Sequence, residues 1–130
     1  MSMLPAFALV ALGVAFGACA RFGAGLAIQR LAGAAFPYAT LFVNAIGSLL
    51  IGVLFVAVLE ARSLPPAMRE LVMVGVLGSF TTFSTFSLET LQLFAAGEPG
   101  KAGLNVVANL VICILFCWFG LVFGRSLHNL

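Results

Sequence analysis

The chain has 130 residues, of which 63% are hydrophobic and only 8% are charged, and its mean hydropathy is +1.22. A water-soluble domain of this length carries far more charge, so the composition excludes a soluble protein. Six basic and four acidic residues give a formal charge of +2, too little for a nucleic-acid surface. We expect an all-α membrane protein with one domain over residues 1–130, because most of the chain is needed to cross a bilayer.

Four stretches lack charged residues, and each is about long enough to span the hydrocarbon core: Leu4 to Ala20, Tyr38 to Leu59, Leu71 to Leu88 and Ala102 to Gly124. The connectors between them are short and contain helix-breaking residues and charge, so none folds alone. The first apolar stretch has no basic region before it, so we do not expect it to be a cleaved signal peptide. The sequence therefore predicts four transmembrane helices.

The basic residues are almost evenly divided between the two sides of the membrane. With four crossings, one side carries Arg62, Arg69 and Arg125, and the other carries Arg30 and Lys101. The Lys/Arg bias that normally orients a membrane protein is therefore nearly absent. This favours a chain that inserts in both orientations and forms an antiparallel, dual-topology homodimer. The alternative, that one extra basic residue is enough to orient the chain, is equally compatible with the sequence.

The third apolar stretch changes character halfway. It is apolar from Leu71 to Phe80, and five of the next seven residues, TTFSTFS, carry hydroxyl groups. Ser and Thr compete for backbone hydrogen bonds, and Gly78 weakens the helix further. The apolar half would rise about 15 Å, so we predict a break near mid-membrane whose free carbonyls suit a small cation. A continuous helix with hydroxyls bonded to preceding carbonyls is the alternative.

Two phenylalanines follow the predicted break. Phe83 and Phe86 are three residues apart and share a helical face, and each is followed by a serine, Ser84 and Ser87. The positive edge of a phenyl ring attracts an anion without gripping it tightly, which suits conduction. Simple packing of the rings is the alternative.

Amide and thiol side chains interrupt the second and fourth apolar stretches. The amide of Asn44 could donate to an anion or form a hydrogen bond between helices. Residues at steps of four make a weakly polar line on the fourth helix: Asn105, Asn109, Cys113 and Cys117. This line is a candidate wall of a narrow pore, although the cysteines are also typical packing residues.

Two charged residues lie next to apolar segments. Arg21, expected near the far end of the first helix, is a candidate vestibule residue that attracts anions. Glu89 ends the hydroxyl-rich segment. It is either a charge that flanks the helix, which is the default, or a residue of an ion pathway.

Several motifs together resemble the CrcB-type, or Fluc, fluoride channels of bacteria: GACARF, TLFVNAIGSLLIG and GVLGSFTTFSTFSLET, followed by a helix of suitable length. The resemblance covers the whole chain. It implies a passive channel in the bacterial plasma membrane that exports fluoride from the cytoplasm. It also implies two pores at the interface of an antiparallel homodimer, with a structural Na⁺ at the breaks of the third helices.

The resemblance further implies roles for individual residues. The backbone carbonyls of Gly78 and Thr81 would bind Na⁺, and Arg21 would be the vestibule base. The anion pore would be lined by Asn44, Phe83, Ser84, Phe86, Ser87, Asn105, Asn109 and Cys113. Family members often have Tyr or hydroxyl residues along the fourth helix, where this chain has amides and a thiol.

Other classes of protein fit less well. A proton-coupled small multidrug exporter needs an acidic residue within the first helix, and Met1 to Ala20 contains none. A non-transporting scaffold would leave Asn44 and the hydroxyl cluster unexplained. An enzyme is not expected, because the single histidine, His128, lies in the tail and no membrane serine has an evident base.

Overall fold

The computed structural model describes residues 2–130. Its helical elements, with η for π-helical segments, are α1 (Met3–Ala32), α2 (Tyr38–Phe55), η1 (Val56–Glu60), η2 (Arg69–Leu77), α3 (Gly78–Phe80), α4 (Phe83–Ala95) and α5 (Pro99–Leu127). Together they form four helices long and apolar enough to cross a membrane: Met3–Ala32, Tyr38–Glu60, Arg69–Ala95 and Pro99–Leu127. The predicted four-helix membrane architecture is confirmed at this level.

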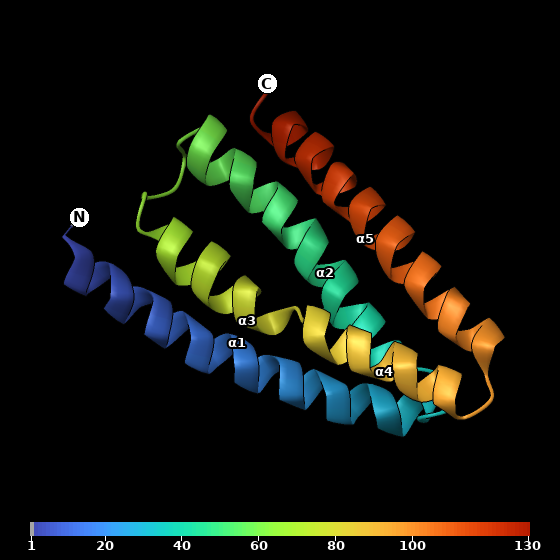
Figure 1. Cartoon of the computed structure of the whole chain (residues 1–130). Coiled ribbons are helices and arrows are strands. Elements are labelled where there is room, and N and C mark those ends of the chain that lie inside the picture. Colours follow the sequence, from blue (N-terminus) through green and yellow to red (C-terminus); the bar gives the residue numbers. More distant parts are fainter. Residues whose placement is uncertain (1) are drawn as a thin grey trace.

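The four helices lie side by side, and the two ends of the chain lie toward the same end of the bundle (Figure 1). α2 packs mainly on α5, α1 packs mainly on η2 and α3, and α4 packs on α5. The four helices run alternately up and down, as four successive membrane crossings require. The connector between η1 and η2, residues 61–68, therefore lies at the same end of the bundle as the two termini.

Glycines allow the backbones to approach closely at the two main helix contacts. A Cβ atom added to Gly75 of η2 would lie 2.8 Å from the Cα atom of Gly13 on α1. A Cβ atom added to Gly120 of α5 would lie 3.1 Å from the Cα atom of Gly52 on α2. Since lipid is as apolar as the helices, such backbone contact is a main source of helix association in membranes.

Large apolar side chains point outward over most of the surface. Phe16 is 68% exposed and Leu31 is 88% exposed, whereas Val43 and Val56 are among the few that are buried. This distribution suits a chain that meets lipid. Within residues 2–130, each buried side-chain nitrogen or oxygen has a hydrogen-bond partner, as the hydrocarbon environment demands.

The first helix is longer than the charge-free stretch predicts. α1 continues to Ala32, so the expectation that Arg21 lies near its far end is wrong. The charge is accommodated inside the helix because Arg21 Nε donates a hydrogen bond of 3.0 Å to the Ser79 carbonyl. A charge in a membrane helix therefore did not mark the end of that helix.

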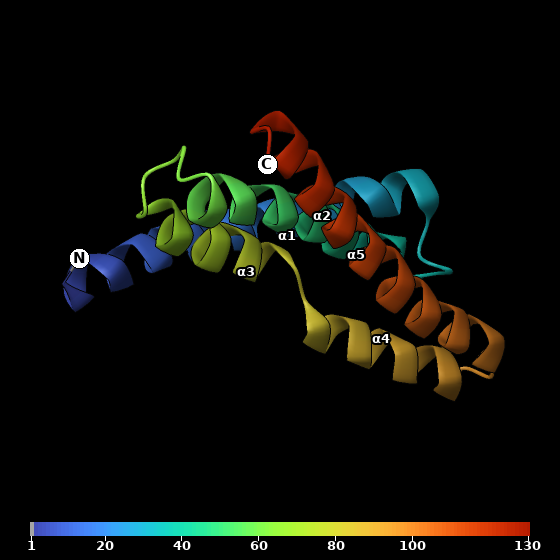
Figure 2. The same ribbon diagram turned by 90° about the horizontal axis from the view of Figure 1, so that it is seen from above.

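α3 ends at Phe80 and α4 begins at Phe83. The two residues between them have extended backbones, with φ −86° and ψ 157° at Thr81 and φ −149° and ψ 123° at Thr82. Figure 2 shows the consequence, because the axis of α4 is displaced from that of α3. The Thr82 side chain accepts a hydrogen bond of 3.2 Å from the backbone N–H of Thr85 and so caps α4.

Candidate functional site

Side chains from other helices take over the hydrogen bonds that are lost between α3 and α4. In a regular helix the Thr82 N–H would donate to the Gly78 carbonyl. Instead it donates to Asn44 Oδ1 at 2.8 Å, so the Gly78 carbonyl loses its helical donor. On the other side, the Ser79 carbonyl accepts from Arg21 Nε. Side chains of α1 and α2 therefore hold the extended residues in place.

A groove of about 330 Å³ lies along α2, α5 and the extended residues. It brings together most of the residues predicted for the pore and the cation site: Asn44, Gly78, Thr81, Phe83, Phe86, Asn109 and Cys113. Ser48 and Thr82 add hydroxyl groups to its lining. Residues that are far apart in sequence therefore form one groove, mostly apolar, into which a few amide, hydroxyl and thiol groups are set.

The two phenylalanines of the groove differ in exposure. Their ring centroids are 5.3 Å apart and the ring planes are inclined by 59°. Phe86 is 7% exposed and packs inside the chain, whereas Phe83 is 73% exposed and projects out of it. The pair thus presents one fixed ring and one ring that a partner surface could contact.

Asn44 forms the interhelical hydrogen bonds that were one of its two predicted roles. Its Nδ2 donates to the Thr82 carbonyl and to Asn109 Oδ1, each at 3.1 Å. Its Oδ1 accepts from the Thr82 N–H. Both amide hydrogens are therefore in use, and an anion at Asn44 would have to replace one of these acceptors.

Three residues predicted for the pore do not line this groove. Ser84 is exposed, and the Ser87 hydroxyl donates to the Phe83 carbonyl at 2.9 Å. Asn105 is fully buried behind Asn109, which donates to it at 3.0 Å. Sequence spacing places these residues on the correct helices but does not determine how each helix is rotated.

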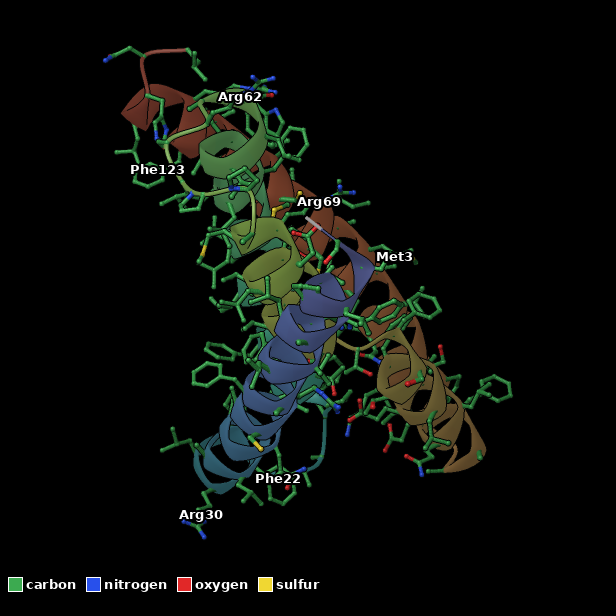
Figure 3. The ribbon with its side chains drawn as sticks, turned by 90° about the vertical axis from the view of Figure 1, so that its left-hand side faces the viewer. Met3, Phe22, Arg30, Arg62, Arg69 and Phe123 are labelled. Carbon is green, nitrogen blue, oxygen red and sulfur yellow. The ribbon has the colours of Figure 1, made fainter. Side chains whose placement is uncertain are left out.

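A second cavity, also of about 330 Å³, lies between α1, α2 and α4. Figure 3 shows the carboxyl-terminal half of α1, marked by Phe22 and Arg30, diverging from α4. Arg21 and Glu89 both line this charged cavity, and Glu89 Oε1 accepts a hydrogen bond of 2.5 Å from the Thr40 hydroxyl. Arg21 therefore belongs to the charged cavity and not to the groove.

The charged cavity contains residues that the sequence did not single out. Thr40 and Thr85 line it, and Thr82 lines both the cavity and the groove. Thr82 and Thr85 belong to the hydroxyl-rich motif TTFSTFS, which drew attention to that segment as a whole. Thr40, a lone threonine at the start of an apolar helix, gave no comparable signal.

The groove, which holds a few polar groups, and the charged cavity meet at Thr82, where a membrane helix is interrupted. Such an arrangement in a multi-pass helical protein is typical of the class of membrane channels and transporters. Within that class, the chain belongs to the CrcB family. Residues 8–121 match the family model described as CrcB-like protein, Camphor Resistance (CrcB).

Similar proteins cover nearly the same length. The chain is 48% identical over 118 residues to the fluoride-specific ion channel FluC of Magnetococcus marinus, covering 91% of this chain and 96% of the relative. It is 46% identical over 125 residues to the FluC protein of Opitutus terrae, covering 93% of both. It is 43% identical over 120 residues to that of Coxiella burnetii, covering 92% of this chain and 97% of the relative.

Proposed function

We propose that the chain is a passive, fluoride-selective ion channel that lets F⁻ leave the cytoplasm of a bacterium across its plasma membrane. The observation that carries the proposal is the groove that joins Phe83, Phe86 and Asn44 next to an interrupted helix. The relatives named fluoride-specific ion channels support it along nearly the whole chain. The activity is conduction and not catalysis.

The chemistry of the groove fits a small anion. Fluoride enters acid-stressed cells as HF, dissociates in the less acidic cytoplasm and is trapped there as the anion, so an open path suffices for its exit. Ring edges of Phe83 and Phe86 and the hydroxyls of Ser48 and Thr82 would replace part of its hydration shell. These partners attract an anion weakly enough to release it again.

Ion efflux from liposomes tests the proposed function. Purified protein in vesicles loaded with potassium fluoride should release fluoride rapidly once valinomycin balances the charge, and chloride-loaded vesicles should stay near the leak rate. A proton-coupled exporter would instead need a pH gradient. A scaffold would release neither ion, and equal release of both ions would contradict the proposed selectivity.

The working unit in this proposal is an antiparallel homodimer with two pores. The exposed Phe83 ring and the exposed Gly78 backbone lie at the groove, where a second copy would cover them. Two copies related by a two-fold axis in the membrane plane would place two equivalent grooves at one interface. The nearly balanced basic residues support both insertion orientations.

The same dimer would hold a structural Na⁺ near the middle of the membrane. The residues fit this ion, because the Gly78 carbonyl has lost its helical donor and Thr81 has an extended backbone beside it in the groove. Carbonyls of unwound membrane helices are known ligands for such cations. The bound ion would supply a fixed positive charge between the two copies.

Removal of sodium is expected to lower fluoride flux. Replacing Na⁺ by N-methylglucamine throughout purification should reduce flux, whereas Thr81→Ser in sodium should match the parent because the ligand is a backbone atom. Flux and a high-resolution density map in both salts are the measurements. A map in sodium with no ion at the Gly78 and Thr81 carbonyls would contradict the site.

A further inference from the structure

Behind the groove, side-chain hydrogen bonds form a continuous series that runs in one direction. In order, the Thr82 N–H donates to Asn44 Oδ1 (2.8 Å), Asn44 Nδ2 to Asn109 Oδ1 (3.1 Å), Asn109 Nδ2 to Asn105 Oδ1 (3.0 Å), Asn105 Nδ2 to Thr90 Oγ1 (2.9 Å) and the Thr90 hydroxyl to the Phe86 carbonyl (2.8 Å). We call the four side chains Asn44, Asn109, Asn105 and Thr90 the amide relay. It crosses from α2 to α5 and returns to α4.

Backbone groups at both ends determine the direction of the amide relay. The Thr82 N–H can only donate, and the Phe86 carbonyl can only accept. Every amide between them must therefore present its oxygen toward Thr82 and its nitrogen toward Thr90. Hydrogen bonds aligned head to tail polarise one another, so each one strengthens the next.

The far half of the amide relay, Asn105 and Thr90, lies outside the groove and the charged cavity. Asn44 and Asn109 line the groove, but Asn105 is fully buried. Of the described residues, those lining the groove and the charged cavity do not include Thr90 or Asn105. For an ion that follows the groove, an effect of Thr90 or Asn105 on conduction is therefore transmitted through other residues.

We propose that Thr90 and Asn105 are positioning residues for conduction, which act through Asn109 on the orientation of the Asn44 amide. This inference rests on the proposed channel function. Asn44 contacts the Thr82 peptide on both its N–H and its carbonyl, so its orientation determines the position of that peptide. The Asn105 position, which resembles a pore position by motif, thus has a different task in this chain.

The physical cost of a wrong orientation shows why the far residues matter. If Asn44 turned over, its Nδ2 would face the Thr82 N–H, and two donors would oppose each other. Asn109 prevents this by offering an acceptor to Nδ2, and Asn105 in turn accepts from Asn109. Loss of the Thr90 hydroxyl removes the acceptor of Asn105 Nδ2, so the Asn105 amide can turn and withdraw its Oδ1 from Asn109. Asn109 Nδ2 then keeps only the Asn105 backbone carbonyl, at 2.9 Å, and holds Asn44 less firmly.

Substitutions at Thr90 test the proposal most directly. Thr90→Val keeps the side-chain shape but removes the hydroxyl, and it should lower fluoride flux per folded dimer about tenfold, the effect of one or two lost neutral hydrogen bonds. Thr90→Ser keeps the hydroxyl and should stay within about twofold of the parent by the same reasoning. Ser126→Ala, at the end of α5 and outside the amide relay, is the control for expression, purification and reconstitution, and it should keep parental flux.

A double-mutant cycle separates positioning from direct contact with the ion. If Thr90 acts through Asn109, the double variant Thr90→Val with Asn109→Leu should lose no more flux than whichever single variant has the lower flux. Multiplied losses, or parental flux in Thr90→Val, would overturn the proposal. If Asn109→Leu does not assemble, Asn109→Ser replaces it in the cycle.

Hydrogen exchange of the Thr82 amide gives a readout that does not depend on fluoride. In Thr90→Val this amide should exchange faster than in the parent, while amides in the middle of α5 stay unchanged. Unchanged exchange at Thr82 would overturn the amide relay even if flux fell. A parent protein that passes no fluoride would instead refute the proposed function and leave the exchange result to decide the relay.

Discussion

A variant with two added lysines beside Arg62, Leu64→Lys with Ala67→Lys, is expected to lose nearly all fluoride flux when expressed alone. The basic residues on that side would rise from three to five, against two on the other side. Such a bias should impose a single orientation on every copy. Copies of one orientation cannot form the proposed antiparallel dimer, so the channel would be absent although each chain still inserts.

The complementary variant provides the control. Ala34→Lys with Ala35→Lys adds two charges to the connector between α1 and α2, which lies at the opposite end of the bundle. Combined with Arg62→Asn and Arg69→Gln, it leaves four basic residues on that side against one on the other, a bias equal and opposite to that of the first variant. Each biased variant should be inactive alone, and co-expression of the two should restore flux. Full activity of either variant by itself would refute the dual-topology dimer.

Phe83→Ile is expected to lower fluoride flux at least about tenfold while leaving assembly intact. The side chain keeps similar bulk but loses the electrostatic edge of the ring, which we propose replaces part of the hydration shell of fluoride. Folding of the chain should tolerate the change because Phe83 is 73% exposed and is not part of the buried core. Flux and dimer content are measured on the same preparation.

A second phenylalanine on the same helix makes a matched comparison. Phe94 is 65% exposed on α4 and is not among the residues that line the groove. Phe94→Ile should therefore retain parental flux. If Phe83→Ile also formed normal dimers and passed fluoride at the parental rate, the ring would serve packing alone.

The membrane architecture could be predicted from sequence because length and apolarity are properties of a single stretch of chain. Tyr38 to Leu59, for example, agrees closely with the observed helix Tyr38–Glu60. The end of α1 could not be predicted in this way. The charge of Arg21 suggests a helix boundary, but its hydrogen-bond partner, Ser79, is 58 residues away in sequence.

The sequence predicts which residue types form the candidate site, but not which of them form hydrogen bonds with one another. Motifs selected Asn44, Phe83 and Phe86, and all three line the groove. The hydrogen bond from Asn105 to Thr90 depends on the rotation of α5 against α4, which no local pattern specifies. For the same reason Ser84 and Ser87, adjacent to the phenylalanines in sequence, fall outside the groove.

The interruption between Phe80 and Phe83 also divides the dipole of the third crossing into two dipoles that point the same way, with ends of opposite partial charge facing each other. The last carbonyls of α3 carry partial negative charge, and the first N–H groups of α4 carry partial positive charge, equivalent to roughly half an elementary charge at a helix end. A cation would therefore be favoured at the α3 side of Thr81 and Thr82, where we propose Na⁺, and an anion at the α4 side, where we propose the fluoride path. Because the backbone itself supplies both fields, charges of opposite sign can be accommodated there without a single ionised side chain in the groove.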